Sequence, residues 1–256
     1  MKISATVITL NEEQNLAAAL ESLSWADEII VVDSQSTDRT VEIASQFTDR
    51  IFIRPWPGYS AQKNFAAEQA RHDWVFNLDA DERVSPDLCK EIETLKSAGE
   101  PAASGFEMPR RTFYLGRWIK HSGWYPDFKV RLYTRSSGRW RGAYVHESVE
   151  SDGQIARLTG PLLHYTVRNA SDHHLRIDRY TTLAAEELAE HGKRVTTLSL
   201  LVSPFMAFVR TYVFRLGFLD GLPGLAIAYF AAHYVFLKGL KLWETQKAEG
   251  HTGGRI

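Results

Sequence analysis

Short apolar runs alternate with amphipathic segments over the first hundred residues. The runs are rich in β-branched and aromatic residues, so they predict buried strands at residues 2–10, 28–33, 50–54 and 74–78. The segments between them have helical periodicity and predict helices at residues 13–24, 40–47 and 60–70. This order of elements is typical of an α/β fold in which a mostly parallel sheet carries helices on both faces.

The pattern changes in the second part of the chain. Further strands are predicted at residues 129–133 and 161–165, and an amphipathic helix at residues 171–191. Two segments of 15 and 17 residues, 195–209 and 221–237, then contain no charged residue. Each is shorter than the roughly 20 residues that cross a bilayer.

We expect these two segments to be helices that lie in a membrane interface or form a re-entrant hairpin. The cations that flank them would then face anionic headgroups: Arg210, Arg215, Lys238 and Lys241. Packing against the rest of the chain or against a second subunit is the alternative. Residues 248–256 are polar and contain glycine, so we expect a disordered tail.

Polar side chains gather where three of the predicted strands end. They are Thr9, Asn11 and Glu12 after the first strand, Asp33, Ser36 and Asp38 after the second, and Asp79 and Asp81 after the fourth. The carboxyl ends of parallel strands share one edge of a sheet, and ligands bind there in such folds. No Gly-x-Gly-x-x-Gly motif follows the first strand and the sequence has no Walker loop, which disfavours a dinucleotide or P-loop site.

Asp79 and Asp81 follow a buried strand directly, with only Ala80 between them. Buried unpaired carboxylates are costly, so this pair predicts a site for a hard divalent cation, Mg²⁺ or Mn²⁺, that also binds substrate phosphates. The alternative is that the two carboxylates cap the next helix, for which Ser85 and Pro86 are a start signal. Among the other polar residues, Asn11 is expected to cap the first helix, and Ser36 and Asp38 to fix their loop.

Composition adds further constraints. The 256 residues are 44% hydrophobic and 24% charged, as in ordinary globular proteins. The single cysteine, Cys89, excludes an intrachain disulfide and suits a reducing compartment, and residues 1–10 are expected to be a core strand rather than a signal peptide. The net charge is −9 over residues 1–100 and +8 over residues 101–256. The second part therefore suits an anionic partner, unless the two parts neutralise each other.

Residues 110–141 contain nine Arg and Lys residues, one acid (Asp127), and many interleaved aromatic residues. Such a segment suits a charged glycan, because aromatic rings stack on sugars and Arg and Lys bind phosphate or carboxylate groups. No RNA-binding or helix-turn-helix pattern is present, so we expect no nucleic-acid partner. The alternative is that most of these aromatics are core and most of the charges are surface.

Four ordered motifs, at residues 4–15, 30–40, 58–64 and 75–82, resemble the family 2 glycosyltransferases of the GT-A fold. The resemblance implies that three residues contact the uridine of a UDP-sugar: Thr9, Asn11 and Glu12. It also implies that Asp33 binds the base edge and that Lys63 lies near the ribose or phosphates. Asp79 and Asp81 would form the metal motif. A solvated helix residue is the alternative for Lys63, and Asn64 has no assigned role.

Two later residues complete the implied site. Glu147 follows a glycine-containing turn at residues 142–148 and resembles the family's catalytic base, although His146 stands where the family usually has an acid. Asp127 is the rival base, and a surface salt bridge is the alternative for Glu147. His164 resembles a late histidine that binds the metal, and a buried structural histidine is the alternative.

The catalytic motifs, the histidine strand and the apolar C-terminal segments together resemble the bacterial lipopolysaccharide inner-core β-glucosyltransferases. The implied activity is inverting transfer of a hexose, with glucose first, from a UDP-sugar to the inner core at the cytoplasmic membrane face. A polyprenyl-phosphate or other lipid-linked acceptor is the alternative, and a sugar-nucleotide-binding scaffold without turnover is a further one. We expect a nucleotide-sugar half at residues 1–100, an acceptor half at 101–192 and membrane-associated helices at 193–247; an oligomer is compatible with the sequence.

Overall fold

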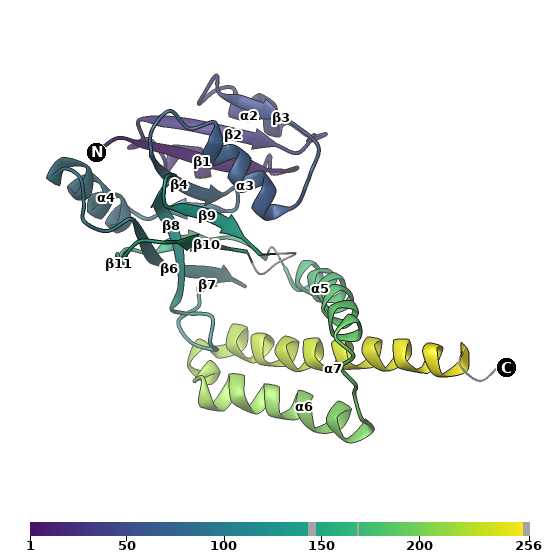
Figure 1. The fold of residues 1–256 in the computed structure, drawn as a ribbon. Coiled ribbons are helices and arrows are strands. Elements are labelled where there is room, and N and C mark those ends of the chain that lie inside the picture. The colour runs from purple at the N-terminus through teal and green to yellow at the C-terminus, as the bar shows by residue number, and fades with distance from the viewer. Residues whose placement is uncertain (143–146, 168, 253–256) are drawn as a thin grey trace. The chain divides into compact units, whose positions relative to one another are not determined.

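The computed structural model describes residues 1–142, 147–167 and 169–252, with side chains described as far as residue 247 (Figure 1). The chain divides into two compact units. Residues 1–111 and 126–166 form a sheet unit, and residues 112–125 and 167–256 form a helical unit. These boundaries differ from the expected ones, because a loop inside the expected acceptor half belongs to the helical unit.

The sheet unit begins with the alternation that the sequence predicts. Its first strands are β1 (Ile3–Thr9), β2 (Glu28–Asp33), β3 (Ile51–Ile53) and β4 (Trp74–Asp79), and its first helices are α1 (Leu16–Glu21), α2 (Thr40–Ala44) and α3 (Tyr59–Glu68). The strands lie parallel in the order β3-β2-β1-β4. The register pairs Thr9 with Asp33 and Ile8 with Asp79, so the three polar clusters meet at one edge of the sheet.

Later strands extend the sheet beyond β4. They are β5 (Glu82–Val84), β6 (Gly105–Tyr114), β8 (Asp127–Thr134), β11 (Ile155–Arg157) and β12 (Leu162–His164), while β9 (Gly138–Arg141) and β10 (Ser148–Ser151) form a separate hairpin. The sheet continues from β4 in the order β8-β6-β12-β5, and β8 is antiparallel to both β4 and β6. This order places β8 directly beside the strand that ends in Asp79.

Alternating side chains of the central strands face two apolar layers. Phe76 of β4 packs in the layer that contains α1 and α4 (Pro86–Ala98), and Val75 in the layer that contains α3. Helices therefore cover both faces, as predicted. Ser85 caps α4 by accepting a hydrogen bond from the Leu88 amide. The alternative in which Asp79 and Asp81 cap this helix is therefore wrong, because β5 lies between them and α4.

Asn11 does not cap the first helix, so that prediction was wrong. The helix α1 begins at Leu16, and Asn11 lies five residues earlier with φ of +54°. Its side-chain oxygen accepts hydrogen bonds from the next loop instead, as described below.

The helical unit contains the loop of residues 112–125 with the short strand β7 (Arg117–Trp118), and four further elements. These are α5 (Ala170–Glu190), α6 (Thr197–Val209) with its continuation η1 (Arg210–Phe214), the turn η2 (Gly217–Asp220), and α7 (Gly221–Thr252). Two segments, Thr197–Phe214 and Gly217–Lys247, are long and apolar enough to cross a membrane by length and composition. Residues 248–252 of the expected disordered tail continue α7, so that part of the prediction was wrong, and residues 253–256 lie outside the described part.

Candidate active site

The loops that follow β1 and β2 brace each other at the carboxyl edge. Both carboxylate oxygens of Asp33 accept hydrogen bonds from Ser36, one from its amide at 2.8 Å and one from its hydroxyl. The Ser36 hydroxyl accepts a hydrogen bond from the Asn11 amide at 2.8 Å, and the Asn11 side chain accepts one from the Thr37 amide at 2.8 Å. Ser36 therefore fixes its loop, as expected, and the positive φ of Asn11 belongs to this bracing.

A second set of contacts braces the same loops closer to α2. The Glu12 amide donates to the Thr40 hydroxyl at 2.8 Å, and Asp38 accepts from the amides of Glu13 and Thr40. Asp38 thus fixes its loop, as expected. The two loops are therefore joined by several hydrogen bonds next to the ends of β1 and β2.

Two polar atoms of this edge have no hydrogen-bond partner within the described residues. They are the hydroxyl oxygen of Thr9, which is 5% exposed, and the side-chain oxygen of Gln62, which is fully buried on α3. The amide of the Gln62 side chain donates to Ser34 at 3.0 Å. Sequence reasoning did not single out Gln62, because only the packing of α3 against β2 turns it toward the site. Unpaired buried polar atoms are groups that a polar ligand can satisfy.

Asp79 lies between two buried cations. Its carboxylate is 3.0 Å from Lys63 Nζ and 2.7 Å from an Arg131 guanidinium nitrogen. The same Arg131 nitrogen lies 2.7 Å from Glu82, which is fully buried. Lys63 and Arg131 are 1% and 3% exposed, so Lys63 is not a solvated helix residue. Sequence reasoning missed Arg131, since its segment showed only the pattern of a strand.

These contacts fix the charge state of Asp79. Burial by itself would raise the pKa of this carboxyl group, but Arg131 and Lys63 outweigh burial and hold its pKa well below the usual value. Burial would lower the pKa of Arg131, whereas Asp79 and Glu82 raise it above its ordinary value. Asp79 and Arg131 are therefore both charged, and each stabilises the other.

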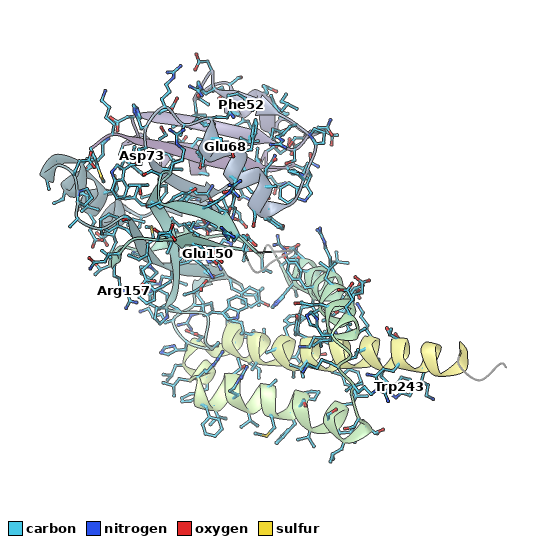
Figure 2. All side chains as sticks on the ribbon, in the orientation of Figure 1. Phe52, Glu68, Asp73, Glu150, Arg157 and Trp243 are labelled. Atoms are coloured by element: carbon cyan, nitrogen blue, oxygen red, sulfur yellow. The ribbon has the colours of Figure 1, made fainter. Side chains whose placement is uncertain are left out.

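Lys63 also reaches Glu147. Its Nζ lies 3.3 Å from one carboxylate oxygen of Glu147, and it lies over the Trp140 ring at 4.2 Å. Trp140 is fixed in turn by Asn64, whose side chain exchanges two hydrogen bonds with the Trp140 backbone. The other Glu147 oxygen is buried and has no hydrogen-bond partner within the described residues. Glu150, which Figure 2 labels, marks the strand β10 that directly follows this residue.

Asp127 has different surroundings. It lies 2.7 Å from Arg110 and 3.0 Å from Lys129. Burial would raise its pKa, but these two cations outweigh burial and lower it. A carboxylate with a lowered pKa that is held by two cations is a poor proton acceptor, which argues against Asp127 as a base. Glu147 is 16% exposed and pairs with the buried Lys63, unlike in the surface salt bridge considered as the alternative. His146 lies in residues 143–146, outside the described part.

Asp81 and His164 come together through strand pairing. The antiparallel strands β12 and β5 set His164 opposite Glu82, and the Tyr165 amide donates to the Asp81 carbonyl at 2.9 Å. His164 Nε2 lies 3.3 Å from an Asp81 carboxylate oxygen. The other ring nitrogen, Nδ1, is buried and has no hydrogen-bond partner within the described residues.

Asp81 and His164 supply two of the ligands that a divalent cation needs, and not a complete set. A carboxylate oxygen and an imidazole nitrogen can both ligate a divalent ion such as Mn²⁺, and Asp81 and His164 supply one of each. Both oxygens of Asp79 already contact cations. Within the described ranges, no group of three or more His, Cys, Asp or Glu side chains is arranged to hold an ion. Asp81 and His164 therefore fit a cation that completes its coordination with substrate oxygens and water.

Comparisons with known proteins extend this picture. Residues 4–151 match the family model described as Glycosyl transferase family 2. The chain is 34% identical over 252 residues to the lipopolysaccharide core biosynthesis glycosyltransferase LpsC of Rhizobium meliloti (strain 1021), which covers 95% of this chain and 93% of LpsC. It is 31% identical to the uncharacterized glycosyltransferase RT0209 of Rickettsia typhi, over 95% of this chain and 87% of that protein.

A solved structure shares the fold. The mannosyltransferase PcManGT from Pyrobaculum calidifontis, in complex with GDP-Man and Mn²⁺, superposes with a TM-score of 0.53 at 14% identity. The match covers 95% of this chain and 87% of that one. At this identity the likeness concerns the fold alone.

We expect Arg131→Met to destabilise the protein by about 3–5 kcal/mol, because it leaves the carboxylates of Asp79 and Glu82 buried with one cation fewer. Urea unfolding followed by circular dichroism measures the change in the free energy of unfolding. The control is Arg139→Met on the neighbouring strand β9, where the side chain is exposed and the change should stay within about 0.5 kcal/mol. Equal stability of the two variants would contradict the buried network.

Proposed function

Because the chain belongs to glycosyltransferase family 2, we propose that it is an inverting enzyme that transfers a hexose, glucose in the first place, from a UDP-sugar to the inner core of lipopolysaccharide. Its α/β sheet has the GT-A fold, as the sequence motifs implied. Support for the acceptor class comes from the likeness to LpsC, which extends over nearly the whole of both chains and includes the apolar C-terminal segments.

The observation that carries the proposed reaction is the contact of the buried Lys63 with both Asp79 and Glu147. It joins the carboxyl edge of the sheet, where sugar nucleotides bind in this fold, to a carboxylate that has one oxygen without a partner among the described residues. A general base needs such an oxygen within reach of the proton that it removes. Lys63 holds the other oxygen, so it orients the carboxylate.

In the proposed reaction Glu147 accepts the proton of the acceptor hydroxyl. The hydroxyl oxygen forms a bond to the anomeric carbon from the face opposite the UDP, and the bond from that carbon to the phosphate oxygen breaks. UDP leaves with the electron pair of that bond. A single displacement inverts the configuration, so an α-linked donor gives a β-linked product.

The other predicted residues have roles on the donor side. We assign Thr9, Asn11, Glu12 and Asp33 to the uridine, since they form or line the braced loops at the ends of β1 and β2. Asp81 and His164 would hold Mg²⁺ or Mn²⁺, and such an ion neutralises charge on the departing diphosphate. Asp79, which the metal motif also includes, has its two oxygens on Lys63 and Arg131, so we propose that it holds these cations next to the nucleotide instead of binding the ion.

We place the enzyme at the cytoplasmic face of the inner membrane, where a lipid-anchored acceptor is within reach of the exposed apolar helices. A polyprenyl-phosphate acceptor is the second candidate, because the same helices and a basic segment also suit a lipid phosphate. A panel of acceptors separates the two.

The deciding experiment is a donor and acceptor screen with the purified full chain. We expect mass analysis to show one hexose added to truncated lipopolysaccharide from a UDP-sugar, and nuclear magnetic resonance to show a β-linkage. Transfer of the hexose to polyprenyl phosphate and not to lipopolysaccharide would show that the second candidate is the acceptor. Binding of UDP-sugars without formation of any product would indicate a sugar-nucleotide-binding scaffold and not an enzyme.

Glu147→Gln is expected to lower the transfer rate by about 10²–10⁴-fold while UDP binding stays unchanged, because the amide cannot accept the proton. Asp127→Asn is the matched control and should retain most of the activity. The rates come from product formation with saturating donor. If instead Asp127→Asn removes activity and Glu147→Gln does not, the base is Asp127.

Asp81→Asn is expected to remove the effect of a cation on UDP binding. Calorimetry should find tighter UDP binding by the wild-type protein with Mn²⁺ than with a chelator, and no such difference in the variant. Asp87→Asn, an exposed carboxylate in the first turn of α4, is the control and should behave like the wild type. Identical UDP affinity of the wild-type protein with and without the cation would argue against a metal site at Asp81.

A further inference from the structure

The helical unit exposes an unusually large number of apolar side chains on its last helices. On α6 they are Leu198, Leu201, Val202, Phe205 and Met206, each 46–70% exposed. Their spacing of three and four residues places them on one face of the helix. On α7 the residues Leu222, Leu225, Tyr229 and Phe236 repeat at intervals that also fall on one face. Contiguous apolar surface of this kind marks a contact with a membrane or another protein.

The charges of this segment favour a lipid surface over a second copy of the chain. Between residues 195 and 243 the sequence has four cations and a single acid, Asp220, which is fully buried. Two of the cations, Arg210 and Arg215, are exposed next to the apolar face. Anionic headgroups over an apolar layer match both properties, whereas two copies would bring like charges together.

The contacts of the turn between α6 and α7 limit how deeply these helices can enter a lipid layer. Asp220 accepts hydrogen bonds from the backbone amides of Lys120 and His121, at 3.3 and 2.8 Å, and lies 3.2 Å from the His121 ring. Arg117 donates to the Asp220 carbonyl at 3.0 Å, and the Ser122 amide donates to the Arg215 carbonyl at 2.8 Å. The turn is therefore tied on both sides of η2 to the loop of residues 112–125.

This attachment conflicts with insertion of the turn into the bilayer. A re-entrant hairpin would carry the turn to its deepest point, and a spanning pair of helices would carry it to the far side. Either would take Asp220 with Arg117, Lys120 and Arg215 into or through hydrocarbon, where charged side chains are strongly disfavoured. A hairpin that lies in the plane of the interface keeps all of them at headgroup level.

We propose that α6, η1, η2 and α7 form a docking surface that lies flat on an anionic lipid surface, with the turn at Asp220 held at headgroup level. The proposed function already includes a membrane, and the reason that the enzyme needs one rests on that function. The docking surface specifies which residues bind the membrane and in which orientation. It also places the loop of residues 112–125 at the lipid surface. Arg117, which is 45% exposed, and the exposed Lys120 would there face phosphate groups.

Vesicle flotation tests the surface and its charge preference. The full chain should float with vesicles of phosphatidylglycerol and phosphatidylcholine, and far less with phosphatidylcholine alone. The double substitution Phe205→Ser and Phe214→Ser should lower the partition coefficient roughly tenfold or more, because two exposed rings no longer enter the interface. Leu175→Ser on α5, where the side chain is 67% exposed, is the matched control and should change nothing.

Flotation needs neither donor nor acceptor sugar, so its outcome is independent of the transfer assay. Failure to float, combined with dimers in light scattering that the double substitution dissociates, would overturn the proposal in favour of an interface between copies. Floating that the double substitution leaves intact would overturn the assignment of this face.

Depth measurements test the flat orientation. In a Cys89→Ala background, Phe218→Cys in the turn and Phe205→Cys in the middle of α6 each carry an environment-sensitive fluorophore. Quenching by lipids with shallow or deep nitroxides should place both probes at similar, shallow depth. A probe at residue 218 that the deep nitroxide quenches more strongly, or that an impermeant quencher reaches only from inside the vesicle, would overturn the flat arrangement.

Discussion

Two buried cations, Lys63 and Arg131, flank the carboxylate of Asp79 where β4 leaves the sheet. Each of its oxygens contacts one of these cations, and the buried cations in turn depend on this carboxylate. The same cations also contact Glu82 and Glu147, so a single network joins α3, β4, β5, β8 and the residue before β10. The position of every catalytic candidate near Asp79 depends on this network, and not on the apolar core alone.

The network extends beyond Asp79 through a third cation. Arg110 lies 3.5 Å from Glu82 and 2.7 Å from Asp127, and Lys129 lies 3.0 Å from Asp127. Asp79, Glu82 and Asp127 each contact two cations. Glu147 contacts only Lys63 and keeps an oxygen without a partner among the described residues. Glu147 is thus the carboxylate of this network with the fewest cationic partners.

The helical unit uses a buried carboxylate differently. Asp220 satisfies backbone amides of the loop of residues 112–125 and thereby closes the turn between two apolar helices. Gly217 and Gly224 permit this turn, since a Cβ on Gly224 would lie 1.8 Å from the Gly217 carbonyl oxygen. In the sheet unit the carboxylates pair with buried cations, and in the helical unit Asp220 fixes the turn that ends an apolar hairpin.

The sequence by itself determined the features that depend on neighbouring residues. Hydrophobic periodicity located β1 to β4 and the helices between them, and the Ser85-Pro86 pair located the start of α4. The polar residues after three strands located the sheet edge where they gather. Each of these signals is local, because a short apolar run marks a buried strand and a cap bonds amides within three residues. The family motifs added residue roles that stay predictions until they are tested.

Only the tertiary structure decided which distant residues meet. Arg131 reaches Asp79 across 52 positions because β8 lies next to β4, and Glu147 reaches Lys63 across 84 positions. Asn11 braces a neighbouring loop instead of capping a helix, and Asp220 binds a loop about 100 positions earlier. Strand order and loop packing set these contacts, and local periodicity contains no information about either, since it records only which face of an element is buried.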